Sequence, residues 1–106
     1  MITQFKKGIV ELCVLKVVSV QDLYGFEVIE KLSEPLSVNE NTIYPILRRL
    51  TNQGLFTTYE KSSSSGAKRK YYEITESGKQ SLKEKLEEWY QFSKNIKLIL
   101  GGNKNE

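Results

Sequence analysis

The chain has no histidine, one cysteine and no long apolar run, and each absence excludes a class of function. Without histidine, the usual general base of enzymes and the commonest nitrogen ligand of zinc are missing. A single cysteine excludes an intramolecular disulfide and a cysteine-cluster metal site. No paired carboxylates lie beside a nucleophile. We therefore predict that the protein is not an enzyme and has no catalytic residues, no metal and no cofactor.

No apolar segment reaches the ~18 residues of a membrane span, and the first residues lack the pattern of a signal peptide. We therefore expect a cytoplasmic protein that has no membrane partner. With 106 residues, the chain is long enough for one small hydrophobic core.

Positive charge is concentrated in one place, although the net charge of +3 is mild. Lys61 precedes a serine-rich segment, and Lys68, Arg69 and Lys70 follow it consecutively. Such a cluster is typical either of an ordinary solvated hairpin or of a loop that contacts phosphates or the minor groove of DNA. We predict the DNA contact for Lys68, Arg69 and Lys70.

An amphipathic helix is predicted around residues 41–52, where four apolar residues recur at i, i+3, i+4 and i+7: Ile43, Ile46, Leu47 and Leu50. The side chains on its other faces are amides, hydroxyls and cations, which suit base edges and phosphates in a DNA groove. The candidate DNA-contacting residues of this helix are Asn41, Thr42, Tyr44, Arg48, Arg49 and Asn52.

Plainer interpretations exist for three of these residues. Arg48 and Arg49 fit a solvated helix face, and Tyr44 fits packing against the neighbouring hairpin. Arg48 nevertheless lies opposite the apolar stripe, in line with Asn41 and Asn52, so it is placed to reach base edges.

The start of this helix is open to two interpretations. Asn39 is the expected N-cap, with Glu40 at the positive end of the helix. Pro45 lacks an N–H, so the helix either starts nearer Thr42 or bends at Asn41.

Two strands are predicted after this helix, at residues 55–61 and 70–74, with Gly54 as the left-handed stop before them. Alternation places Tyr72 and Ile74 on the inward face of the second strand. Helix, turn, strand, basic hairpin and strand follow one another in the order of a winged helix-turn-helix. The predicted fold class is therefore mainly α with a small β-hairpin.

Residues 5–18 predict a first helix that is apolar on nearly its whole circumference, although a strand competes at its β-branched end. A chain of this size can hardly cover such a helix, so part of it should face another subunit. Cys13 lies within it, as a buried core residue or, alternatively, as a sensing thiol.

A second helix is expected to begin at Asp22 as its N-cap and to end at Pro35. Gly25 in its first turn lowers helix propensity, which indicates a close approach to a neighbour. Its predicted buried positions are Leu23, Phe26, Ile29 and Leu32.

A long last helix is predicted from its N-cap Thr75 to Leu100, with Gly101 and Gly102 ending it. Such a helix would extend roughly 39 Å, beyond the small domain it leaves. A heptad seam runs along it through Leu82, Leu86, Trp89, Ser93, Ile96 and Leu100. We predict a homodimer whose interface contains Ile9, Leu12, Leu82, Leu86, Trp89 and Ile96.

The predicted organisation has three parts. Residues 1–74 form the winged helix-turn-helix domain with its N-terminal helix, residues 75–102 form a dimerisation helix, and residues 103–106 form a disordered tail.

The sequence resembles the PadR family of bacterial transcriptional regulators, in its short form with one C-terminal helix. The resemblance covers roughly residues 9–92. It is carried by L-Y-G-F-E at residues 23–27, T-I-Y-P-I-L-R-R-L at 42–50, Q-G-L at 53–55, R-K-Y-Y-E-I-T-E-S-G at 69–78, and Trp89. The chain departs from the family at the tip of the wing, where four serines precede Gly66, and at Lys85, where drug-binding members have a small neutral residue.

This resemblance implies a homodimeric winged-helix protein that binds double-stranded DNA, usually as a repressor. Two third helices related by a dyad should enter successive major grooves, so we predict an inverted-repeat operator. In some members a tryptophan at the place of Trp89 lines a cavity for a small planar aromatic inducer. An effector site at Trp89 and Lys85 is therefore expected if such control exists, with a plain core role for Trp89 as the alternative. A winged helix that contacts proteins and does not bind DNA remains the alternative function.

Overall fold

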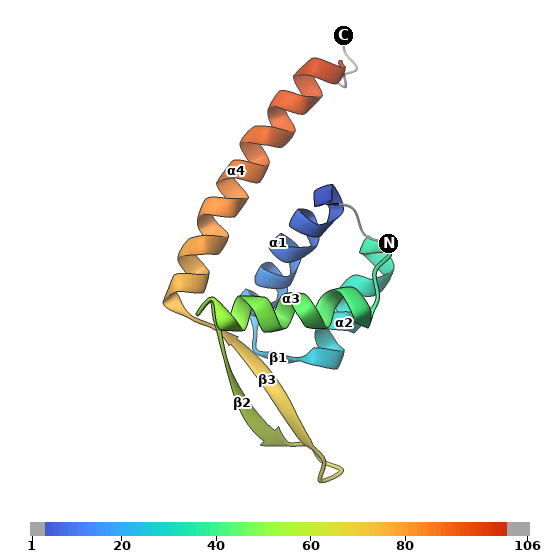
Figure 1. The fold of residues 1–106 in the computed structure, drawn as a ribbon, viewed down its shortest axis with the longest axis vertical. Helices are drawn as coiled ribbons and strands as arrows, with labels where there is room; N and C mark the ends of the chain where they lie inside the picture. The colour runs from blue at the N-terminus through green and yellow to red at the C-terminus, as the bar shows by residue number, and fades with distance from the viewer. Residues whose placement is uncertain (1–3, 102–106) are drawn as a thin grey trace.

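The computed structural model describes residues 4–101, which form four helices and a three-stranded antiparallel sheet. Three helices make the body: α1 (Gln4–Val20), α2 (Gly25–Leu36) and α3 (Glu40–Asn52). Two arms leave this body in opposite directions in Figure 1: the hairpin of β2 (Phe56–Ser62) and β3 (Lys68–Ile74), and the last helix, α4 (Glu76–Leu100). This architecture confirms the predicted winged helix-turn-helix followed by a long C-terminal helix.

The sheet contains a strand that the sequence did not predict. A short β1 (Leu23–Tyr24) pairs with β3, so the strand order is β1-β3-β2. Because β1 occupies residues 23 and 24, Asp22 does not cap α2, which corrects the prediction. Tyr24 is extended and immediately precedes the helix, and its N–H donates to Glu27 Oε1 at 3.1 Å.

The start of α2 at Gly25 also changes which of its side chains are buried. Val28 and Leu32 face the core and Ile29 is half-buried, whereas Phe26 is 54% exposed, so its predicted burial was wrong. Pro35 does not end the helix, because α2 runs to Leu36 and is followed by Ser37 in the left-handed region at φ 54°.

The third helix begins upstream of its proline. The Asn39 side chain caps α3 as predicted, with Oδ1 accepting from the Asn41 N–H at 2.9 Å. The helix therefore starts at Glu40 rather than near Thr42, and it continues through Pro45. The predicted apolar stripe of Ile43, Ile46, Leu47 and Leu50 is buried. Gly54, at φ 79°, makes the predicted turn into the wing.

The core lies where α1 packs against α2, α3, β3 and the first turns of α4. Val10, Val14, Leu15 and Val18 are the buried residues of α1. Cys13 is half-buried at the edge of this core, and burial raises the pKa of its thiol, so the reactive thiolate is disfavoured. No helix within residues 4–101 combines the length and apolarity of a membrane span.

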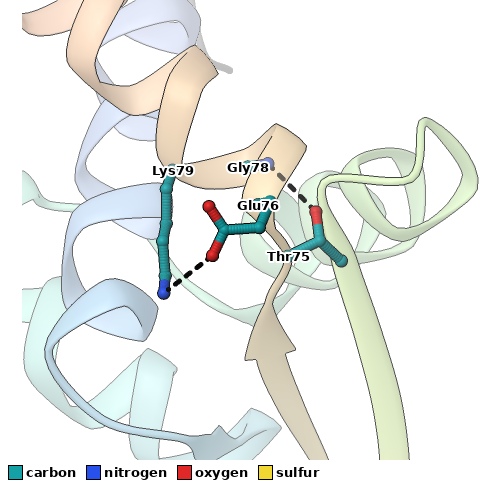
Figure 2. Close-up of polar contacts among 4 residues, drawn as sticks. All are labelled: Thr75, Glu76, Gly78 and Lys79. Carbon is teal, nitrogen blue, oxygen red and sulfur yellow. Dashed lines mark hydrogen bonds and ion pairs between the residues drawn. The ribbon is translucent and has the colours of Figure 1, made fainter.

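The junction between the wing and α4 is tightly fixed. Thr75 Oγ1 accepts from the Gly78 N–H at 3.0 Å, as the predicted cap, and donates to the Gly54 carbonyl at 2.7 Å. Figure 2 shows this cap beside the contact between Lys79 and Glu76. A Cβ on Gly78 would lie 2.2 Å from the Leu55 carbonyl oxygen, so only glycine fits.

Beyond its first turns, α4 leaves the body as a single helix (Figure 1). Leu82 is buried, and the following seam residues Leu86, Trp89, Ser93 and Ile96 are each partly exposed. The left-handed Gly101 ends the helix. The predictions for Gly102 and for a disordered tail at 103–106 lie outside the described residues.

Candidate nucleic-acid interface

The exposed ridge of α3 contains four of the predicted DNA-contacting residues. Asn41, Tyr44, Arg48 and Asn52 are all exposed. Because the apolar stripe of the helix is buried on the opposite side, these four side chains project from the body. They form a ridge of amide, phenol and guanidinium groups that can donate to base edges and phosphates.

A groove of about 550 Å³ separates this ridge from the wing. Tyr44, Arg48 and Asn52 contribute from α3, and Thr51 lies beside them. The wing contributes Lys68, Arg69 and Lys70 together with Thr58 and Tyr72, and the start of α2 contributes Tyr24, Gly25 and Phe26. The structure thus brings together six of the nine predicted residues around one cationic groove.

The remaining three residues do not line this groove, although Asn41 belongs to the exposed ridge. Asn41, Thr42 and Arg49 line a smaller hollow at the start of α3, which they share with Lys7 of α1. Arg49 forms an ion pair with Glu11 of α1, and both side chains are partly exposed. Arg48 and Arg49 are adjacent in sequence but face different surroundings, because consecutive helical residues differ by ~100°.

Tyr44 is held against the start of α2. A Cβ on Gly25 would lie 2.7 Å from Cε1 of Tyr44, so glycine at this position lets the ring approach the α2 backbone. This contact explains the glycine that weakens the first turn of α2. Tyr72 lies below the same groove, and burial raises the pKa of its phenol while the nearby Arg48 opposes the rise. Tyr44 and Arg48 therefore both approach the base of the wing.

The two faces of the wing carry different side chains. Strand alternation puts Lys68, Lys70 and Tyr72 on one face and Arg69 and Tyr71 on the other. Arg69 lies 4.5 Å from the ring centroid of Tyr24, and Lys61 lies 5.2 Å from that of Tyr71.

Sequence reasoning predicted a DNA contact for Arg69 but did not assign a role to Tyr24, Tyr59 or Tyr71. Tyr71 stacks on Tyr59 with centroids 5.5 Å apart and meets Tyr24 edge-on at 5.4 Å. Tyr59 donates a 2.6 Å hydrogen bond to Asp22, which raises the pKa of Tyr59 to about 12 and keeps the phenol neutral. Alternation in β2 and β3 groups Tyr59, Lys61, Arg69 and Tyr71, but the sequence gives no sign that β1 brings Tyr24 beside them.

The residues predicted for a dimer interface lie on two helices that touch near the body. Ile9 and Leu12 are partly exposed on α1, and Leu86, Trp89 and Ile96 are partly exposed along α4, whereas Leu82 is buried in the core of one chain. Lys85 is exposed one helical turn before Trp89.

Comparison with known proteins gives a consistent result. Residues 14–84 match the family described as Transcriptional regulator PadR-like family. A solved structure of a PadR-like transcriptional regulator from Bacillus cereus is 37% identical, with a TM-score of 0.84 over 95% of this chain and 100% of that chain. A PadR family transcription regulator from Clostridium difficile is 30% identical, with a TM-score of 0.79 over 86% of this chain and 97% of that one. An uncharacterised protein of Lysinibacillus sphaericus is 31% identical over 91% of this chain and 92% of its own length.

Proposed function

The chain belongs to the PadR-like family of transcriptional regulators, and from this premise we propose that it binds double-stranded DNA sequence-specifically as a homodimeric repressor. The family consists of regulators rather than enzymes. The observation that carries the proposal is the groove in which an exposed helix face and three consecutive wing cations meet. Its cationic, hydrogen-bonding lining matches a phosphate-walled groove of DNA.

The α3 ridge is proposed to enter the major groove. Arg48 is the base-reading candidate, because it is exposed and its fork of donors matches the acceptors O6 and N7 of guanine. Asn52 and Asn41 flank it along the ridge, and Tyr44 can donate to a phosphate. Arg49, which is paired with Glu11, is instead proposed to fix α3 to α1.

The wing is proposed to follow the DNA backbone beside the helix. Lys68, Arg69 and Lys70 form the wall of the groove opposite α3. They carry positive charge without a base-reading geometry of their own, so their contribution should be electrostatic and independent of sequence.

A homodimer is proposed to form through α1 and the outer half of α4, residues 89–100. Tyr90, Phe92, Leu98, Ile99 and Leu100 are all more than half exposed there. An isologous pair would cover both apolar helices at once and close the assembly.

Two recognition helices related by a dyad enter successive major grooves about 34–36 Å apart, so the operator is proposed to be an inverted repeat. Residues 1–74 are proposed as the DNA-binding unit and residues 75–102 as the dimerisation helix of a cytoplasmic protein. An effector, if one exists, is proposed to act at Trp89 and Lys85 in the dimer seam.

The proposal is tested by selecting bound sequences from random duplex DNA and measuring their affinity by fluorescence anisotropy at several salt concentrations. We expect an inverted repeat and a steep salt dependence. Replacing Lys68, Arg69 and Lys70 by alanine should weaken binding to every sequence and reduce the log–log salt slope by about three, at 0.9 per lost phosphate contact. Recruitment of RNA polymerase to a promoter bearing the selected repeat then tests repression.

If DNA binding does not depend on salt and no sequence is selected, the alternative function is supported instead, namely a winged helix that contacts proteins. The Lys31→Ala variant is the control for the loss of charge, because Lys31 lies on α2 beside a different hollow.

A further inference from the structure

The second face of the wing carries two cations directly opposite each other. Lys61 of β2 pairs in register with Arg69 of β3, and strand alternation puts both side chains on the same face. Like charges at directly opposed positions destabilise a sheet. The next pair of the same hairpin, Glu60 with Lys70, has opposite charges and avoids this cost. The Lys61–Arg69 pair is therefore unfavourable for the fold and needs a reason outside hairpin stability.

Aromatic rings support both cations. Arg69 lies over Tyr24 and Lys61 lies over Tyr71, at distances typical of cation–π contacts. Tyr71 is itself held by stacking on Tyr59 and by the edge of Tyr24. Three strands thus contribute to one tyrosine layer, defined as Tyr24, Tyr59 and Tyr71, which carries the two cations on its surface.

Acidic side chains do not neutralise this pair. Within residues 4–101, neither Lys61 nor Arg69 lies within ion-pair distance of a carboxylate. Asp22 is nearby at the base of the layer, but it accepts the hydroxyl hydrogen bond of Tyr59. Two adjacent cations that are supported from below and unneutralised above leave their N–H groups available to an anion.

We propose that Lys61 and Arg69 form a second phosphate-binding site of the wing, positioned by the tyrosine layer, for a phosphodiester of the bound DNA. This site rests on the proposed DNA-binding function. Lys68 and Lys70 face the α3 groove, whereas strand alternation puts the side chains of Lys61 and Arg69 on the other face of the hairpin. Arg69 also lines the edge of the groove, together with Tyr24. A hairpin tip that lies over a minor groove can contact the phosphates that border the groove with cations from both of its faces.

Tyr24 has a particular role in this site as a positioning residue. It lies on β1 as a diagonal neighbour of Arg69 on the adjacent strand β3, because Tyr24 itself pairs with Tyr71. Its ring, rather than its hydroxyl, supports the guanidinium. Removing the ring should therefore impair Arg69, and replacing tyrosine with phenylalanine should not.

The test compares the salt dependence of DNA binding for Lys61→Ala and Arg69→Ala with that of Lys31→Ala. The probe is the selected inverted-repeat duplex, together with an unrelated duplex of equal length. Each wing substitution should reduce the log–log salt slope by about one on both duplexes, whereas the control should leave it unchanged. Lys61→Glu should weaken binding further without lowering the thermal midpoint, because it places opposite charges across the hairpin.

Tyr24→Leu should weaken binding about two- to fivefold, and Tyr24→Phe should restore it. In the Arg69→Ala background, Tyr24→Leu should have a smaller effect on affinity than in the wild-type protein. In the Lys68→Ala background it should keep its full effect. Circular dichroism checks that each variant is folded.

If wild-type protein binds DNA and Arg48→Ala weakens it, but the slopes of Lys61→Ala and Arg69→Ala equal that of wild type, the second phosphate site is overturned and the proposed function stands. Full additivity of Tyr24→Leu with Arg69→Ala removes the positioning role. Wild-type protein that binds no DNA defeats the proposed function itself.

Discussion

The groove beside α3 and the outer half of α4 differ in how well a single chain covers and positions their side chains. In the groove, side chains are already held by neighbours: Tyr44 lies against Gly25, and Arg69 lies over Tyr24. Along the outer half of α4, Phe92 and Leu98 are more than half exposed. The first surface is polar, cationic and preorganised, and so suits a partner of different chemistry. The second is apolar and uncovered, and so suits another copy of itself.

The largest effect is expected from a charge placed on the α4 seam, which tests whether this surface forms the dimer interface. Ile96→Asp would bury an uncompensated carboxylate in the proposed interface, which costs about 3–5 kcal/mol. Sedimentation velocity should then show monomers. Asn95→Asp is the matched control, because it adds the same charge at the exposed neighbouring position and should remain dimeric.

Deletion of residues from Leu86 onward should likewise abolish dimerisation and lower the stability of the fold. A truncated chain that stays folded and dimeric would show that the interface lies elsewhere.

The junction between the two regions can be tested at Gly78. Its substitution by alanine would press a Cβ against the Leu55 backbone, where no flexible side chain can give way. We expect Gly78→Ala to lower the free energy of unfolding by about 1–3 kcal/mol. Chemical denaturation measures this loss.

Gly8→Ala provides the contrast, because a Cβ at this position of α1 meets nothing within 4 Å. It should stabilise the protein by about 0.4–1 kcal/mol, through the restricted unfolded chain. Equal midpoints for the two variants would contradict the close contact at the wing base.

Two adjacent arginines of α3 are expected to have different roles, one in DNA binding and one in stability. Arg48→Ala should cost about 1–3 kcal/mol of binding and relax specificity at one base position, because its side chain projects from the exposed ridge. Arg49→Ala should retain specificity and lower stability by up to about 1 kcal/mol, because a partly exposed ion pair with Glu11 is lost. Competition binding to single-base variants of the operator and urea unfolding measure the two effects. If only Arg49→Ala relaxes specificity, Arg49 reads the base and Arg48 does not, which contradicts the proposed roles.

Local signals were sufficient for most of the fold. The four-residue apolar stripe of α3 spans about two helical turns, and the caps Asn39 and Thr75 and the left-handed Gly54 act within one turn. The sequence therefore predicts them directly. The alternation in β3 likewise predicted that Tyr72 is buried.

Errors arose where a distant segment decides the local structure. Leu23 and Tyr24 form a strand because β3 lies beside them, and pairing with a segment almost 50 residues away leaves no local pattern. That strand moved the start of α2 to Gly25 and turned Phe26 outward. Helical periodicity also placed Arg49 near the polar side, but it cannot reveal a carboxylate 38 residues away on α1. Within the site, the sequence predicted the cations of the wing, while the tyrosine layer required the sheet register.

The smallest expected effect concerns ligand binding at Trp89, the single tryptophan of the chain. It is partly exposed on the α4 seam, and two indoles across a dimer axis would sandwich a planar molecule by stacking. A ligand held there releases DNA only if it favours a dimer whose recognition helices are wrongly spaced. Lys85, one turn away and exposed, should favour an anionic aromatic such as a phenolic acid over a cationic dye.

Titration of the intrinsic fluorescence should therefore show stronger quenching by phenolic acids, and Lys85→Ala should reverse that preference. The same ligands added to the anisotropy assay should weaken operator binding only where they quench. If neither class quenches and DNA binding is undisturbed, Trp89 is part of the apolar seam alone. The α4 surface would then serve only the proposed dimer contact, and control of DNA binding would act at another place.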